Sequence, residues 1–584
     1  MSHLIAEGGR SDWYITAGRN ADEVVRYAAE QLNMLLYRAT GALVPYHSDI
    51  KSRSSVSNKH GPEFLLGPGV RPNLGYNVPT EDLEPEGFRI RSCGEDIVIV
   101  SPTSRGVLYG VYAFLERFCG YRRFSSKVER LPFNPKLEVP ELDIAENPAF
   151  ECRDVYWRDA FDGKFASANR INSGKADISL KQGGMVRFFN FHHAMLDLVP
   201  ELEYFADHPE YYAEVDGVRK PTQLCLSNQE VIRLSAEKVK SWIAANPDCK
   251  VFSIAQNDNR EYCRCEKCRA LDEAEGSPAA SVIAFSNAVA EEVCAEYPDI
   301  LLHTFAYQYS RKAPKNLCAH DNVIVRLCDI ECSFSRPLSR YAENQPDSTE
   351  AKFVEDLRNW SEKTKHLYVW DYCTNFSHYL APFPNLASLQ ENIRLFRDCG
   401  VKGIFTEGNF SHGGNGAMAE LQAYLQARLF WNPDIDLDLT INDFLAGYFG
   451  AGAPYIRRAL DLWQDAVKDA DMRIYYRPDA AFITDELVEE SLRLCDLALA
   501  AAETPEIYER VDRARLSYEY IYLVRLPLET EGRSLLIDGF GRRLKAYRIT
   551  EVSERAHLEW SLEKMKTSRY NIDNSGRDSI YYRM

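Results

Sequence analysis

The sequence of 584 residues has little positive charge relative to negative charge, and it has no long apolar run. Lysine and arginine number 69 against 86 aspartate and glutamate residues, which gives a formal net charge of −17. Binding to nucleic acid or to an anionic membrane needs a basic surplus, so we expect neither partner. No apolar run approaches the roughly 18 residues of a membrane-spanning helix. The start, MSHLIAEGGRSDWYITAG, lacks a basic segment followed by an apolar one, so a cytoplasmic location is expected.

Signature motifs of several enzyme classes are also missing. The sequence has no phosphate-binding GxxxxGK loop, no dinucleotide-binding GxGxxG turn and no GxSxG nucleophile turn. These absences argue against nucleotide hydrolysis, nicotinamide chemistry and serine-hydrolase chemistry, and we expect no cofactor. Aromatic residues, in contrast, are plentiful, with 33 Tyr, 28 Phe and 8 Trp. They suit a large α/β core and also a cleft that binds sugar rings.

Composition divides the chain into three zones. Residues 1–145 predict a small α/β domain, in which a helix capped by Asn20 ends at Gly41 and a strand covers Asp96–Val100. The proline-rich stretch Leu131–Pro148 is interpreted as a linker. Residues 433–584 are mainly helical. We expect this tail to pack on the preceding zone, closing one side of a cleft there or supporting a homo-oligomer.

Residues 146–432 alternate strand-like and helical segments, which predicts an α/β fold with a parallel sheet. The length of this zone suits a (β/α)₈ barrel, which takes roughly 250 residues. Helices are expected near 281–297, 351–363 and 386–399. The expected strands are Cys152–Trp157, Val186–His192, Lys250–Ala255, Leu301–Tyr307, Val323–Cys328, Leu367–Asp371 and Gly403–Thr406.

In such a barrel the functional groups follow the C-terminal ends of the strands. Carboxylates, amides and aromatic rings gather at these positions, and this mixture suits cleavage of a glycosidic bond, which needs an acid and a flat platform under the sugar. Each residue also has a structural interpretation: Asp258 could cap a helix, Glu331 could pair with Arg326 or Arg336, and Trp370 could simply pack. The strand-end candidates are His192, His193, Asn257, Asp258, Asn259, Tyr307, Gln308, Asp329, Glu331, Trp370, Asp371, Tyr372, Glu407 and Asn409.

The motif Cys263-Arg-Cys265-Glu-Lys-Cys268 is the most distinctive local pattern. Three thiols at this spacing could bind zinc, with Cys225, Cys294, Cys328 or a histidine as the fourth ligand. The alternative is three reduced thiols that pack a tight turn. Because a second CxxC is absent, we expect no metal.

Several segments resemble a known family. Phe252–Val293 is similar to the core of domain of unknown function 4838, a group that overlaps glycoside hydrolase family 163. Residues 108–124 are similar to the small α/β domain that precedes the barrel in β-hexosaminidases and α-glucuronidases. Further similar stretches are Phe191–His193, His208–Lys220, Asn322–Leu338, Leu367–Leu386 and Val401–Phe410.

The resemblance implies a (β/α)₈ barrel with β-N-acetylglucosaminidase activity on oligosaccharides or N-glycan-derived substrates. In the related β-hexosaminidases an Asp-Glu pair ends the fourth strand, and here Asn257-Asp258 stands in the matching place. A retaining, substrate-assisted mechanism would use Asn257 to orient the acetamido group and Asp258 as general acid. Glu331 is the rival acid, and a facing pair of Asp258 and Glu331 would raise the pKa of one of them. The expected substrate-binding residues are His192, Tyr307, Trp370, Asp371 and Glu407.

Three other functions stay open at this point. One is a different glycosidase on the same scaffold, similar to α-glucuronidases, in which two carboxylates invert the anomeric centre. Another is a non-catalytic carbohydrate-binding barrel, which would tolerate the loss of Asp258 and Glu331. The third is a zinc protein built around Cys263, Cys265 and Cys268.

Overall fold

The computed structural model describes residues 2–18, 20–48, 61–68, 70–71, 74–413 and 416–570. The chain forms two compact units. The first comprises residues 1–185, 418–459 and 492–515, and the second comprises residues 186–417, 460–491 and 516–584. None of the described helices is both long and apolar enough to cross a membrane. All fifteen cysteines are free thiols.

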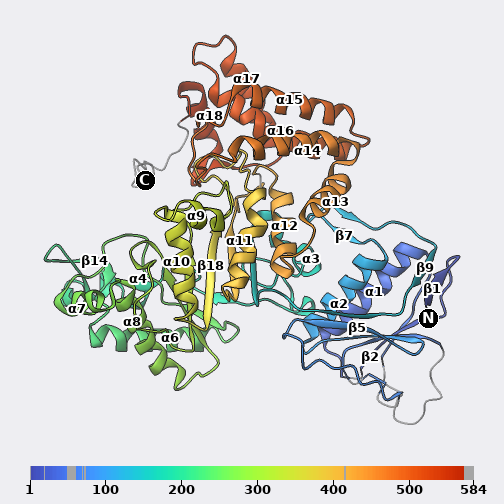
Figure 1. Ribbon diagram of the computed structural model, residues 1–584, viewed down its shortest axis with the longest axis horizontal. Coiled ribbons are helices and arrows are strands. Elements are labelled where there is room, and N and C mark those ends of the chain that lie inside the picture. The colour runs from blue at the N-terminus through green and yellow to red at the C-terminus, as the bar shows by residue number, and fades with distance from the viewer. Residues whose placement is uncertain are drawn as a thin grey trace. The chain divides into compact units, whose positions relative to one another are not determined.

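The first unit contains a mixed sheet with strand order β10-β5-β6-β4-β2-β3. Helices α1 and α2 pack side by side against one face of this sheet (Figure 1). Asp22, rather than Asn20, caps α1, and Gly41 ends it in the left-handed conformation with φ of 75°. The elements are β1 (His3–Glu7), β2 (Tyr14–Ala17), α1 (Glu23–Thr40), β3 (Tyr46–Ser48), β4 (Glu63–Leu66), β5 (Phe88–Cys93), β6 (Asp96–Val100) and α2 (Ser104–Phe118).

The expected linker at Leu131–Pro148 is wrong in part, because two strands form inside it. β9 (Lys136–Val139) pairs with β1, and β10 (Asp143–Glu146) adds an edge strand to the mixed sheet. The prolines of this stretch lie outside both strands, so neither strand loses a backbone N–H donor.

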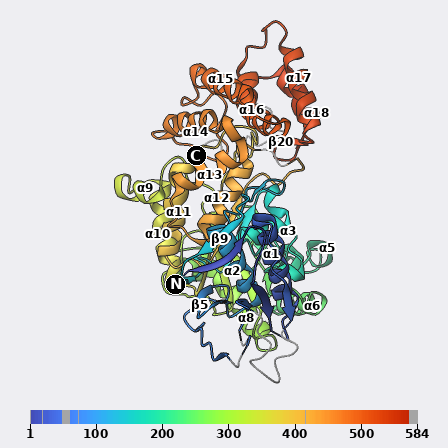
Figure 2. The ribbon, with the colours of Figure 1, turned by 90° about the vertical axis from the view of Figure 1, so that its right-hand side faces the viewer.

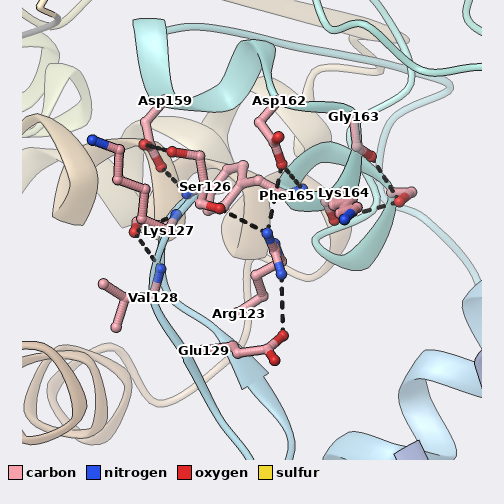
Figure 3. Close-up of polar contacts among 12 residues, drawn as sticks. Arg123, Ser126, Lys127, Val128, Glu129, Asp159, Asp162, Gly163, Lys164 and Phe165 are labelled. Atoms are coloured by element: carbon pink, nitrogen blue, oxygen red, sulfur yellow. Dashed lines mark hydrogen bonds and ion pairs between the residues drawn. The ribbon is translucent and has the colours of Figure 1, made fainter. Parts of the chain in front are cut away.

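A short hairpin of β7 (Arg122–Arg123) and β8 (Glu129–Arg130) is held by polar contacts within the first unit. The Arg123 guanidinium lies 3.1 Å from the Glu129 carboxylate and 3.8 Å from that of Asp162 (Figure 3). The backbone N–H of Ser126 donates to Asp159 over 2.7 Å. The hairpin is thereby tied to the segment after β11 (Cys152–Tyr156). Two further helices of this unit are α12 (Ala419–Trp431) and α13 (Leu437–Phe449).

The second unit is built on a parallel sheet with strand order β19-β18-β17-β16-β15-β12. All seven predicted strands of the central zone form, although β12 and β15 are shorter than expected. Because the strands run parallel, their C-terminal ends share one edge. The strands here are β12 (Phe188–Phe189), β15 (Val251–Ser253), β16 (Leu301–Ala306), β17 (Val323–Cys328), β18 (His366–Tyr372) and β19 (Gly403–Glu407).

Helices flank the strands as expected. α6 and α8 lie side by side in two perpendicular views (Figures 1 and 2). The fold class is confirmed: an α/β protein with a parallel half-barrel sheet, consistent with a (β/α)₈ barrel, and a helical C-terminal region. The division at residues 145 and 432 stays a prediction. The helices of the central zone are α6 (Gln229–Ala245), α7 (Glu266–Glu275), α8 (Ala279–Cys294), α9 (Leu338–Asn344), α10 (Thr349–Ser361) and α11 (Leu386–Asp398).

The C-terminal region adds helices and one small hairpin. The helix α16 begins at Pro505, directly after Thr504, because proline fits the first position of a helix, and the buried Val488 lies on α15. Between the last helices a two-stranded hairpin forms. These elements are α14 (Ala453–Val467), α15 (Asp485–Ala500), α16 (Pro505–Arg525), α17 (Arg533–Ala546), β20 (Glu551–Ser553), β21 (Ala556–His557) and α18 (Leu558–Thr567).

Candidate active site

A cavity of about 760 Å³ lies at the C-terminal ends of the parallel strands in the second unit. Its apolar wall is a cluster in which Trp370 packs against Phe305 and Tyr307. The centroids of the Trp370 and Phe305 rings are 5.6 Å apart, and the two rings meet edge to face. Five of the eight residues predicted for catalysis and substrate binding line this cavity: His192, Asp258, Tyr307, Trp370 and Glu407. Four other strand-end candidates line it as well: His193, Asn259, Gln308 and Tyr372.

Two predicted catalytic residues are not among the described residues that line it. The Asn257 amide is already used, since its Nδ2 donates to the Thr222 carbonyl over 2.8 Å. Glu331 lines a separate hollow of about 270 Å³ and pairs with Arg311 at 2.7 Å, rather than with Arg326 or Arg336. Glu331 therefore does not face Asp258, because the Arg311 guanidinium holds it elsewhere.

The predicted binding residue Asp371 is also outside the cavity lining among the described residues. It is buried beside Asp329 at the ends of β18 and β17. Burial raises the pKa of Asp371 to about 7. Burial and the Asp371 charge together raise the pKa of Asp329 well above its ordinary value. At neutral pH Asp329 therefore keeps its proton beside Asp371.

Asp258 is exposed to the cavity on the loop after β15. Its Oδ1 accepts hydrogen bonds from Tyr307 Oη at 3.0 Å and from Gln308 Nε2 at 3.2 Å. No described residue donates to the second carboxylate oxygen. Gln308 has a φ of 51°, a left-handed conformation that costs a non-glycine residue energy and is found at functional sites. Asp258 does not cap the helix after it, since Cys265 occupies the N-cap of α7.

Glu407 ends β19 and lines the same cavity. Burial raises its pKa to about 8, and the negative charges of Glu554 and Asp258 add to this shift. A hydrogen bond from Trp370 Nε1 to Glu407 Oε2, 3.0 Å long, opposes the shift by favouring the ionised form. Glu407 is therefore protonated at neutral pH and can act as an acid.

The Trp370→Phe variant should shift the pH dependence of any reaction that uses this acid. Removing the indole donor leaves the Glu407 carboxylate with less stabilisation, so its pKa should rise. A single hydrogen bond contributes about 0.5–1.5 kcal/mol, which corresponds to up to about one pKa unit. The measurement is the alkaline limb of kcat/KM against pH. A limb that moved to lower pH would contradict this assignment of the Trp370 contact.

Four cavity residues come from the C-terminal region: Ile474, Tyr475, Glu554 and Arg555. The expectation that the tail closes one side of the cleft is thus met within the second unit. Glu554 and Arg555 lie in the turn between β20 and β21 and are 3.8 Å apart. Sequence reasoning missed them, because a Ser-Glu-Arg turn carries no signal of a distant cavity. Arg260, three residues before Cys263, was also missed, because the segment was interpreted only through its cysteines as a metal-binding candidate.

The fold and this site define an α/β-barrel protein with a carboxyl-lined, aromatic-walled cavity at its strand ends. The chain belongs to the family defined by domain of unknown function 4838, whose model matches residues 123–461. This range includes most of the segments that resemble the family. No curated protein matches the sequence.

Distantly similar solved structures include glycoside hydrolases. One is the N-acetyl-β-hexosaminidase of Streptomyces plicatus in complex with Thio-NAglucal, with 15% identity, coverage of 76% of this chain and 91% of that one, and a TM-score of 0.41. A mutant of that β-hexosaminidase in complex with the product GlcNAc has 14% identity, the same coverage and a TM-score of 0.40. A family 138 enzyme targeting pectin rhamnogalacturonan II has 10% identity, coverage of 97% and 96%, and a TM-score of 0.46.

Proposed function

We propose that this protein is a glycoside hydrolase that cleaves β-linked N-acetylglucosamine in oligosaccharides or glycan-derived substrates. The observation that carries the proposal is that a protonated carboxyl group and a second carboxyl group line one cavity. Glu407 holds a proton at neutral pH, and Asp258, fixed by two hydrogen bonds, lines the same space. The Trp370 ring beside them supplies an apolar surface of the kind on which sugar rings stack.

In the proposed reaction the acetamido oxygen of the substrate attacks the anomeric carbon, and the bond to the leaving oxygen breaks. Glu407 gives its proton to that oxygen. Asp258 accepts a hydrogen bond from the acetamido N–H and stabilises the positive charge of the cyclic intermediate. The Glu407 carboxylate then takes a proton from water, which opens the ring with retained configuration. Glu407 here takes the general-acid role that the sequence analysis gave to Asp258, with Glu331 as its rival, and Asp258 takes the role of orienting the acetamido group that was given to Asn257.

A specific observation supports a second candidate. Arg260 and Arg555 both line the cavity, and guanidinium groups bind the carboxylate of an acidic sugar in a bidentate manner. A uronidase similar to α-glucuronidases would then use Asp258 and Glu407 as two carboxyl catalysts. The distance between these carboxyl groups in a substrate complex would be about 6.5–9.5 Å for inversion.

A panel of aryl glycosides separates the two candidates. The N-acetyl-β-glucosaminide should be cleaved, while the glucoside of the same aryl group, which lacks the acetamido group, should be cleaved far more slowly. Faster release from a glucuronide, lost in the Arg260→Ala variant, would favour the acidic sugar instead. N-glycan fragments read by mass spectrometry then give the natural linkage. No turnover across the panel, combined with sugar binding, would contradict both candidates and favour a binding protein.

A further inference from the structure

Four cysteine side chains outside the cavity form one buried cluster. They are Cys225, Cys263, Cys265 and Cys268, and their Sγ atoms all lie within 4.8 Å of one another. The Sγ atoms of Cys225 and Cys265 are 3.7 Å apart. Disulfide sulfurs are bonded at about 2.05 Å, so these are four separate thiols. Cys225 directly follows β14 (Val218–Leu224), which pairs with β13 (Tyr212–Val215), and it packs with the three cysteines at the start of α7.

The spacing is that of a tetrahedral metal site. Zinc binds thiolates at about 2.3 Å, and four sulfurs at the corners of such a tetrahedron are about 3.8 Å apart. The separation of 3.7 Å between the Cys225 and Cys265 sulfurs agrees with this edge, and all the sulfur pairs lie within 4.8 Å. We propose that the four cysteines bind one zinc ion. Because four protein ligands fill the tetrahedron and leave no open position, this zinc is structural rather than catalytic.

The surroundings of the cluster favour thiolates. The backbone N–H of Glu214 donates to Cys263 Sγ at 3.3 Å, and Arg219 Nη1 lies 3.8 Å from the same sulfur. N–H donors to sulfur and a nearby positive charge lower the cost of burying anionic ligands around a metal. The zinc site departs from our sequence-based expectation of no metal, which rested on the absence of a second CxxC.

The proposed site would fix the loop that carries the cavity residues. Asp258 and Arg260 lie just before Cys263 in the chain, and Gln223 lies two residues before Cys225. Gln223 Nε2 donates to the Asn257 carbonyl at 2.8 Å and to Asn259 Oδ1 at 3.1 Å. Zinc would therefore clamp β14 to the Asp258 loop on one side, while Gln223 bonds them on the other. This clamp would hold the loop in place whatever substrate the cavity binds, so the inference does not depend on the proposed sugar.

The first experiment is elemental analysis of the purified full chain after removal of loosely bound metal. We expect about one zinc per chain. The Cys265→Ser variant should contain little zinc and unfold at a lower temperature. The Cys318→Ser variant is the matched control, because Cys318 is an exposed thiol outside the cluster, and it should keep both the zinc and the stability.

A second measurement keeps the proposal testable if Cys265→Ser does not fold. An organomercurial added to the unmodified chain should release about one zinc per chain to a chromogenic chelator once the thiols have reacted. The cobalt-substituted chain should show the visible absorption bands of tetrahedral thiolate coordination. A folded chain that contains no zinc, takes up none when zinc is supplied and gives no cobalt bands would overturn the proposal. Because none of these readouts measures turnover, a failure here is distinct from a failure of the glycosidase proposal.

Discussion

Replacing Glu407 with glutamine is expected to lower kcat/KM by about 10²–10⁴-fold on substrates with poor leaving groups, the range typical of general acid catalysis. The amide has almost the same shape but has no acidic proton to give to the leaving oxygen. For aryl glycosides whose phenolate leaves without protonation, the variant should slow the bond-breaking step much less. The measurement is kcat/KM for a series of leaving groups, in which the variant should show the steeper dependence on leaving-group pKa.

Glu331→Gln is the informative comparison for this variant. Glu331 pairs with Arg311 and lines a separate hollow, so its loss should affect stability more than the leaving-group dependence. If Glu331→Gln reproduced the leaving-group pattern and Glu407→Gln did not, the acid would be Glu331, the rival acid of the sequence analysis. Folding of both variants would be checked by thermal unfolding.

The pH dependence follows from the same carboxyl group. Glu407 is active when protonated and has a pKa of about 8, so kcat/KM should fall as the pH rises through about 8. Stability should change in the same direction. Between an ordinary pKa of 4.5 and about 8 the folded chain keeps a proton that the unfolded chain has lost, so the free energy of unfolding decreases as the pH rises. Glu407→Gln should lack both effects, and a variant with an unchanged alkaline limb would contradict this role for Glu407.

The sequence predicted the fold better than the site because the fold depends on local patterns. Strand positions such as Val323–Cys328 were predictable because runs of apolar, β-branched residues between helices form buried parallel strands. The strands inside the proline-rich segment were missed, since β9 and β10 are short and lie between prolines. Asp258, Tyr307, Trp370 and Glu407, which the barrel rule selected as strand-end residues, line one cavity.

The errors in the site arise from contacts between residues far apart in the chain. Whether Asn257 faces the cavity depends on the Thr222 carbonyl, and the direction of Glu331 depends on Arg311. Neither partner follows from periodicity or spacing. Cys225 as the fourth thiol and Arg555 in the cavity likewise depend on hairpins that bring distant segments together.

Asp258→Asn is expected to lower turnover of N-acetylglucosaminides by about 10²–10³-fold, the loss typical of removing one group that stabilises developing charge. The asparagine keeps the size of the side chain but presents a neutral amide to the positive oxazolinium ring. Tyr307→Phe removes the 3.0 Å bond to Asp258 and the bond that Tyr307 Oη accepts from Gln308 Nε2, but leaves the bond from Gln308 to Asp258, so it should cost less and leave KM closer to that of the unmodified chain. The measurement is single-turnover kinetics, which separates bond cleavage from release of product.

A thiazoline analogue of the cyclic intermediate tests whether the substrate's acetamido group or an enzyme carboxylate is the nucleophile. If the acetamido group attacks, the analogue resembles the high-energy species and should bind far more tightly than the parent sugar, by at least about 10²-fold. Asp258→Asn should lose most of this advantage, because the charge that favours the analogue over the sugar is gone. Suppose instead that the analogue binds no better than the sugar and that glycosides without the acetamido group are cleaved equally well. Substrate assistance would then be excluded, and Asp258 and Glu407 would have to act as a pair of carboxyl catalysts, with the configuration of the released sugar deciding between inversion and retention.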